Sequence, residues 1–158
     1  MARQARSRQV SESVVEMTEI VLPEDSNPRG TVFGGRVLAL IDKCAAIAAM
    51  RHARTEVLTA SLDSVEFRNP VRVGQILALR ARINAAFRSS MEIEVEVHSE
   101  NPRSGGRNLT TRAFVTMVAV DDEARPTSVP RLEPRNDEER SRIAAAGERR
   151  RQRLAGRS

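Results

Sequence analysis

One segment, from Gly35 to Arg51, limits the possible folds of this chain more than any other. It is rich in alanine and leucine, lacks proline, and ends in seven consecutive apolar residues from Cys44 to Met50. Alanine and leucine favour helix. At about 3.6 residues per turn, seven apolar residues cover every side of a helix, and a helix that is apolar all round is usually buried. The segment therefore predicts one long helix enclosed by the rest of the fold.

The rest of the middle of the chain reads as strands. Residues 91–97 alternate strictly between apolar residues and glutamate, which is typical of a strand with one wet face. Residues 77–83 also keep apolar residues at the odd positions, with Arg80 and Arg82 on the opposite face, so 84–90 is predicted to be the hairpin connection between the two strands. The set of five predicted strands is completed by residues 13–22, 57–67 and 113–120. A single central helix surrounded by sheet, an α+β fold, is the simplest arrangement.

The two ends of the chain differ from its middle in charge. The formal net charge of +5 resides at the ends, because residues 1–9 hold three arginines and no acid, and residues 135–158 hold eight arginines against four acids. We expect a disordered arm over 1–10, a folded domain over 11–132, and an Arg-rich helix and tail over 133–158. The helix is expected over about 137–153, polar and at the surface, after a proline-containing linker at 129–134.

Composition excludes several classes of protein. The folded body is slightly acidic and the chain has no Trp or Tyr, so we expect no specific nucleic-acid partner. No run approaches the roughly 20 apolar residues that span a bilayer, and the charged N-terminus is not followed by the apolar stretch of a signal peptide. We therefore expect no membrane insertion and a cytoplasmic location. One cysteine and two histidines do not supply a tetrahedral zinc site, so no metal is expected.

Asp42 is the most informative single residue. It lies within the predicted helix, where its neighbours one turn away are Leu38, Ala39, Ala45 and Ala46, none of which can pair with it. A buried carboxylate without a partner is costly or has its pKa raised. Asp42 must therefore find a donor on another segment, reach solvent in a cleft, or take part in chemistry; a purely structural hydrogen bond remains one of the alternatives.

The residues before the helix point to the same region. Residues 27–35 form a turn followed by the pair Gly34-Gly35 at the predicted start of the helix. The N-terminus of a helix presents unpaired N–H groups and a partial positive charge, which suit an oxyanion or a polarised carbonyl. Glycine there lets a substrate approach the backbone closely.

Taken together, Asn27, Gly30, Phe33-Gly34-Gly35 and Asp42 resemble the active-site segment of the hotdog-fold acyl-CoA thioesterases. Residues 65–74 resemble the strand and turn that follow the helix in this family, and residues 116–121 resemble its last strand. The resemblance covers roughly residues 11–132. It implies a hotdog fold, in which a five- to six-stranded antiparallel sheet wraps a long central helix, here followed by a C-terminal surface helix. The activity that it implies is hydrolysis of an acyl-CoA thioester to a carboxylic acid and free CoA.

The same resemblance implies roles for individual residues. Asp42 would be the general base that activates water, or the nucleophile, and Asn27 would position water or the carbonyl group. Gly34 and Gly35 would donate N–H groups to the thioester oxygen. No metal or cofactor would be needed, because coenzyme A is part of the substrate. A non-catalytic hotdog domain that senses acyl-CoA or a nucleotide remains the alternative, whereas a hydratase is disfavoured because the helix lacks a suitably placed histidine.

The spacing of these groups predicts more than one subunit. Gly35 and Asp42 are seven residues apart, which is about 10 Å along a helix. A reacting carbon must lie within roughly 3 Å of both groups. We therefore expect a composite site in which Asp42 of one subunit faces the helix start of another, and hence a dimer at least. The family resemblance further implies a hexamer, a trimer of dimers.

Arginines are the natural partners of the CoA phosphates, because the guanidinium group donates two hydrogen bonds at once. The first candidates for contact with CoA are two arginines and the residues beside them. These are Phe67 and Arg68 at the end of a predicted strand, and Arg88, Ser89 and Ser90 in the predicted hairpin. Arg103 and Arg107, around a glycine-containing loop, are the second choice. For each of them an ordinary exposed arginine is the alternative. His52 is expected to be a cationic cap at the end of the helix, and Asp63 could line the site.

Overall fold

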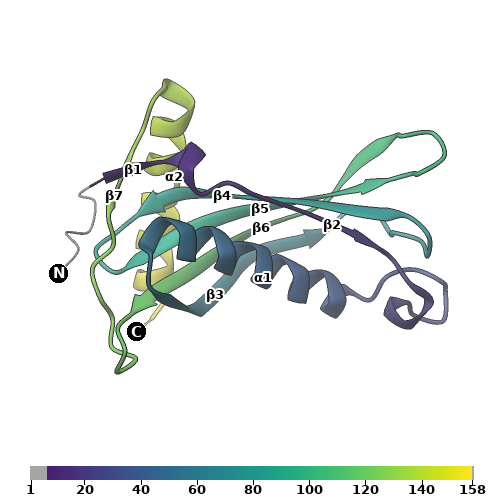
Figure 1. The fold of residues 1–158 in the computed structure, drawn as a ribbon, viewed down its shortest axis with the longest axis horizontal. Coiled ribbons are helices and arrows are strands. Elements are labelled where there is room, and N and C mark those ends of the chain that lie inside the picture. The colour runs from purple at the N-terminus through teal and green to yellow at the C-terminus, as the bar shows by residue number, and fades with distance from the viewer. Residues whose placement is uncertain (1–6, 158) are drawn as a thin grey trace.

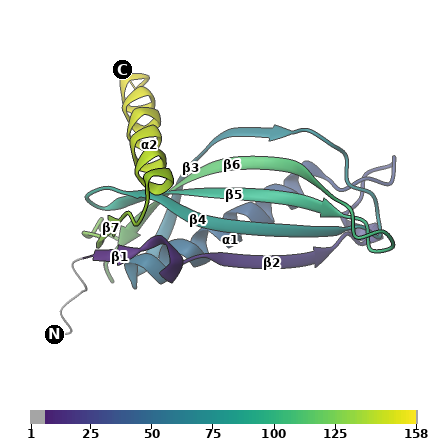
Figure 2. The same ribbon diagram turned by 90° about the horizontal axis from the view of Figure 1, so that it is seen from above.

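The structure, a computed structural model, describes residues 7–157. One long helix, α1, lies against one face of a five-stranded antiparallel sheet of order β2-β4-β5-β6-β3 (Figures 1 and 2). The helix spans Gly34–Ala53, and the strands span Val15–Ile20 (β2), Glu56–Phe67 (β3), Ile76–Ala86 (β4), Ser90–Glu100 (β5) and Arg107–Val120 (β6). The predicted α+β class, with its long helix and antiparallel sheet, is confirmed.

The core lies between α1 and the sheet. Small residues such as Ala45 and Ala48 let the helix approach the strands closely, and the odd-numbered apolar residues of β4 and β5 face it. The opposite side of α1 is not covered, because Ala39, Lys43 and Met50 are exposed. The prediction of a helix buried on all sides is therefore wrong for a single protomer.

The turn between β4 and β5 is shorter than predicted. The two strands continue to Ala86 and start again at Ser90, so the loop is 87–89 rather than 84–90. Asn84 suggested a turn, but it lies in the sheet beside a register shift between Ile83 and Ala85. Its side chain donates hydrogen bonds to Glu92 and Glu94 on β5, which keeps it in the strand.

The glutamate face of β5 is not wet where the second helix, α2 (Asp137–Ala155), covers it. Glu92 is only 3% exposed, and its carboxylate accepts hydrogen bonds from Arg149 of α2. Glu94 is likewise buried and accepts one at 2.7 Å from Arg142. Figure 2 shows α2 near the end of the molecule where β1 and β7 lie. The polar C-terminal helix is thus docked on the sheet by ion pairs.

The predicted arm and linker contain structure. Residues 1–6 of the expected arm lie outside the described residues, but Ser7–Gln9 form β1, which pairs in parallel with β7 (Arg131–Glu133). Two short 3-10 helices, η1 (Val10–Glu12) and η2 (Pro23–Asp25), precede and follow β2 in the chain. Within residues 7–157, no helix combines the length and the apolar character needed to cross a membrane.

His52 does not act as a cationic cap. It is fully buried, its Nε2 is 2.8 Å from the carbonyl oxygen of Pro130, and burial lowers its pKa. The helix ends instead at Arg54, whose backbone is left-handed. A neutral His52 therefore attaches the segment before β7 to the core.

Candidate active site

The start of α1 leaves two backbone donors free. Phe33 occupies the N-cap position without a side-chain cap, and its carbonyl oxygen accepts from the N–H groups of Arg36 and Val37. The N–H groups of Gly34 and Gly35 have no acceptor within residues 7–157. Free N–H groups at the positive end of a helix are suited to stabilise a developing negative charge on oxygen.

Asp42 finds its partner on the strand that follows the helix. The side chain is half-buried, and its Oδ1 accepts a hydrogen bond of 2.6 Å from Oγ1 of Thr59 on β3. Sequence reasoning did not identify Thr59, although chain geometry could have done so. From Asp42 to the helix end is about 16 Å, and a returning strand covers about the same distance by Thr59.

The Asp42–Thr59 pair lies in a cleft of about 580 Å³, which we call the Asp42 cleft. Its lining is Gly35, Leu38, Ala39, Asp42, Thr59, Leu62, Val65 and Phe67. Asp42 and Thr59 are the only side chains in this lining that can form hydrogen bonds. The cleft therefore combines the Asp42–Thr59 pair with an otherwise apolar lining, and it reaches the helix start at Gly35.

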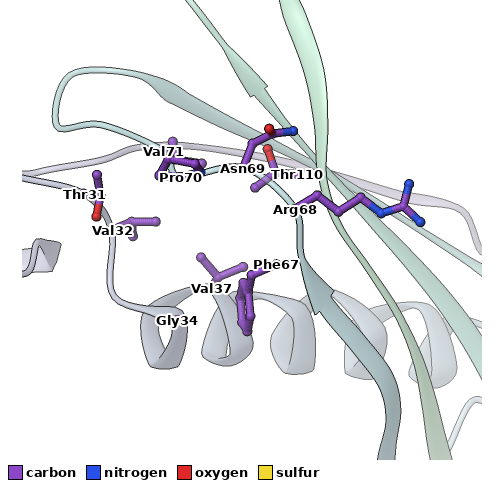
Figure 3. A pocket seen from close by; sticks show the side chains of 10 residues that line it. All are labelled: Thr31, Val32, Gly34, Val37, Phe67, Arg68, Asn69, Pro70, Val71 and Thr110. Carbon is purple, nitrogen blue, oxygen red and sulfur yellow. The ribbon is translucent and has the colours of Figure 1, made fainter.

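A second cleft of about 340 Å³, the Gly34 cleft, adjoins the start of α1 (Figure 3). It is lined by Thr31, Val32, Gly34, Val37, Phe67, Arg68, Asn69, Pro70, Val71 and Thr110. The ring of Phe67 points toward the first turns of α1, whereas the side chain of Arg68 extends away from it. The structure thus brings the Phe67 side chain to the helix start, whereas Arg68 lines the same cleft with its guanidinium group directed away from α1.

Asn27 lies in neither cleft. Its Oδ1 accepts from the N–H groups of Arg29 and Thr31, and its Nδ2 donates to Oγ1 of Thr31 at 2.8 Å. Within one protomer, Asn27 therefore shapes the turn that leads into α1 and does not line the Asp42 cleft.

The second group of predicted CoA contacts lies at the other end of the sheet. Ser90 pairs with Val118, which pairs with Leu58 near the start of β3, whereas Phe67 ends that strand. Nine residues of strand between Leu58 and Phe67 correspond to about 30 Å. Arg88, Ser89 and Ser90 therefore do not join Phe67 and Arg68 in one site of a single protomer.

Other candidates have structural partners elsewhere. Asp63 lies 3.5 Å from Arg153 of α2 and does not line the Asp42 cleft, and Arg107 pairs with Glu100. Cys44 is buried, and burial raises its pKa to about 11, so it is not a ready nucleophile. No group of three or more potential metal ligands occurs among the residues that the structure describes.

The edge strand beside the Asp42 cleft is incomplete by itself. None of the 12 residues of β3 is fully buried, and Leu58 and Phe67 are more than half exposed. One side of β3 pairs with β6, and its other side has no strand partner within residues 7–157. A long unpaired strand edge with exposed apolar side chains is normally covered by another chain or element.

Comparison with known proteins identifies thioesterases in each case. The family model described as thioesterase superfamily matches residues 29–105. An uncharacterised acyl-CoA thioester hydrolase of Bacillus subtilis is 40% identical over 133 residues, which cover 84% of this chain and 77% of that protein. The rat cytosolic acyl coenzyme A thioester hydrolase is 35% identical over 85% of this chain, which spans only 36% of that longer protein.

Two solved structures closely match the whole fold. A hexameric acyl-CoA thioesterase in its apo form has a TM-score of 0.91 and 45% identity, over 95% of this chain and 96% of that one. An acyl-CoA hydrolase from Staphylococcus aureus, solved in complex with butyryl coenzyme A, coenzyme A and coenzyme A disulfide, has a TM-score of 0.88 and 38% identity. That match covers 96% of this chain and 92% of the S. aureus chain.

Proposed function

Because this chain belongs to the thioesterase superfamily, we propose that it is an acyl-CoA thioesterase, which hydrolyses acyl-CoA to a carboxylic acid and free coenzyme A. The observation that carries the proposal is the 2.6 Å hydrogen bond from Thr59 to Asp42, in an apolar cleft that also reaches the helix start. The hotdog-type fold and the names of the related proteins support it.

In this proposal Asp42 carries the chemistry. Thr59 holds Oδ1, and Oδ2 has no hydrogen-bonding partner among the described residues, so it is available to a water molecule. As general base, Asp42 takes a proton from water while the water oxygen attacks the thioester carbon. The carbon–sulfur bond then breaks, and coenzyme A leaves as the thiolate and takes up a proton. Direct attack by the carboxylate, through a mixed anhydride that water then cleaves, is the alternative route.

The remaining groups of the site have supporting roles. The free N–H groups of Gly34 and Gly35 would stabilise the negative charge that develops on the thioester oxygen. Thr59 is a positioning residue, because it acts through Asp42. Asn27 would position water or the carbonyl, from a turn whose geometry its own hydrogen bonds maintain. A thioester has a good leaving group, so the proposed reaction needs no metal or bound cofactor.

We place the complete site between two subunits. Gly35 and Asp42 are separated by about 10 Å along α1, so they do not reach the same carbon within one protomer. A second copy that covers β3 and the open side of α1 would bring its own Asp42 toward the first copy's helix start. This homo-oligomer, a dimer or a trimer of dimers, agrees with the hexameric state named for one similar structure.

The same assembly would reconcile the two groups of CoA contacts. Phe67 and Arg68 lie at the helix start of one subunit, so Arg88, Ser89 and Ser90 would have to come from another. The name of the rat relative supports a cytoplasmic location for this activity.

The test is a comparison of the natural chain with the Asp42→Asn variant. Release of free thiol is measured with acyl-CoA substrates from C2 to C18. We expect turnover by the natural chain and a loss of at least about 100-fold in kcat for Asp42→Asn, because one group supplies the base or the nucleophile. Binding of free CoA should be unchanged. A natural chain that hydrolyses no acyl-CoA would refute the proposal.

A further inference from the structure

Phe67 lies at the boundary between the two clefts at the start of α1. Among the described residues it alone lines both clefts. Gly34 and Val37 belong to the Gly34 cleft, whereas the next residues, Gly35 and Leu38, belong to the Asp42 cleft. Phe67 therefore lies between the two clefts, beside the first turns of the helix.

The position of the ring depends on Gly34. A Cβ atom at Gly34 would lie 3.3 Å from Cζ of Phe67, closer than most side-chain contacts, so the ring would have to shift by a few tenths of an ångström. At Gly35 the same added atom would meet nothing within 4 Å. The two adjacent glycines are thus not equivalent, because Gly34 makes room for the ring and Gly35 faces the open Asp42 cleft.

The two clefts differ in which polar side chains line them. Thr31, Asn69 and Thr110 give the Gly34 cleft several polar groups beside its valines. Between Phe67 and Asp42, the other cleft offers Leu38, Leu62 and Val65. A ligand with a polar arm and an apolar arm fits this division, and an acyl-CoA has both, since its pantetheine arm carries amides and its acyl chain does not.

We infer that Phe67 is a specificity-determining residue that separates the pantetheine arm in the Gly34 cleft from the acyl chain in the Asp42 cleft, which the second subunit of the proposed assembly would close. The thioester between the two arms then lies beside the ring, where the free N–H groups of Gly34 and Gly35 are. The inference rests on the proposed function. Its consequence is that the Phe67 ring forms the end wall of the acyl site nearest the thioester. The ring then fixes where the acyl chain begins, and so how long a chain the cleft accepts.

The test compares substrate preference in three variants. Phe67→Ala and Phe67→Leu remove or reduce the ring, and Ile20→Ala is the control. Ile20 is an apolar side chain on β2 that is 59% exposed against 52% for Phe67, and it lines neither cleft. The readout is the ratio of kcat/KM for the best acyl-CoA to that for acetyl-CoA. Folding of each variant is checked by circular dichroism.

We expect this ratio to fall about tenfold in Phe67→Ala and about threefold in Phe67→Leu, the scale on which lost apolar contacts change discrimination. In Ile20→Ala it should stay within about twofold of the natural value. If Phe67→Ala does not fold, Phe67→Leu decides. An unchanged ratio in a folded Phe67 variant that still hydrolyses acyl-CoA would overturn the inference and leave the proposed function standing.

A second arm tests the contact with Gly34. Gly34→Ala should lower the ratio about threefold by displacing the ring, and Gly34→Ala combined with Phe67→Leu should lower it less than the product of the two single effects. Independent, multiplicative effects would contradict the role of the ring contact. A natural chain without any hydrolysis would defeat the proposed function itself, a result distinct from both of these outcomes.

Discussion

Replacing Arg149 with methionine tests how α2 is held on the sheet. Nε and Nη2 of Arg149 donate to the two carboxylate oxygens of Glu92 at 2.9 and 2.6 Å. The guanidinium also lies 3.9 Å from the centre of the Phe114 ring. Methionine retains much of the apolar stem that packs there and removes the charge, so Glu92 is left buried with the side chain of Asn84 as its donor.

The size of the effect follows from this burial. Loss of one partner from a buried ion pair costs about 3–5 kcal/mol. The Arg149 side chain is 28% exposed and Asn84 keeps one hydrogen bond to Glu92, so the lower end of that range applies. We therefore expect the free energy of unfolding to fall by about 3 kcal/mol. A double variant, Arg149→Met with Glu92→Gln, should regain about half of this loss, because the stranded charge is gone.

The assay is urea unfolding followed by circular dichroism, at one protomer concentration because oligomerisation contributes to stability. Arg151→Met is the control. Arg151 lies on the same helix, but its side chain is 76% exposed and pairs with Glu148 on the helix surface. Its loss should change the free energy of unfolding by less than about 0.5 kcal/mol. Equal losses for Arg149→Met and Arg151→Met would refute the docking of α2 by buried charge.

Three further predictions concern single side chains. Thr59→Val should lower kcat about 10- to 100-fold with little change in KM, since a hydrogen bond to a charged group is lost, whereas Thr18→Val, at an exposed position of β2, should leave kcat unchanged. Steady-state kinetics measure both variants, and a Thr59→Val variant with the kcat of the natural chain would contradict the role of Thr59. Cys44, whose pKa burial raises to about 11, should resist alkylation at pH 8 in the folded protein and react in urea; rapid labelling without urea would contradict its burial. Burial lowers the pKa of His52, so the unfolded chain binds the proton more readily, and the free energy of unfolding should fall as pH drops below about 6.5. His52→Gln should weaken that dependence in urea titrations at several pH values, and an unaltered dependence would show that another group causes it.

Much of the fold could be predicted because its strongest patterns are local. The alanine-rich helix and the strands β4 and β5 depend on short-range periodicity, and the structure confirms both. The sequence misleads where a residue's partner lies far away in the chain. Glu92 and Glu94 look like a wet face until Arg149 and Arg142 arrive from a helix about 50 residues later in the chain.

The candidate site shows the same limit. The sequence reveals Asp42, because no residue one turn away on its helix can pair with it. It does not reveal Thr59, because that hydrogen bond depends on how β3 returns beside α1. Arg88 and Arg68 have the same chemistry in the sequence, and only the strand register places them at opposite ends of the sheet.

The central claim, that each site combines Asp42 of one subunit with the helix start of another, is tested most directly by mixing two inactive variants. Asp42→Asn removes the carboxylate, and Gly35→Val fills the cleft at a position where an added Cβ meets no neighbouring atom. In a mixed dimer, one of the two sites then receives both natural groups.

The two variants are unfolded together, refolded at equal concentration, and assayed for thioester hydrolysis. Random pairing makes half of the dimers mixed, so we predict about a quarter of the natural specific activity, from two proteins that are each inactive alone. A site within a single protomer would leave every site with one damaged component. Refolded mixtures without activity would therefore contradict the composite site.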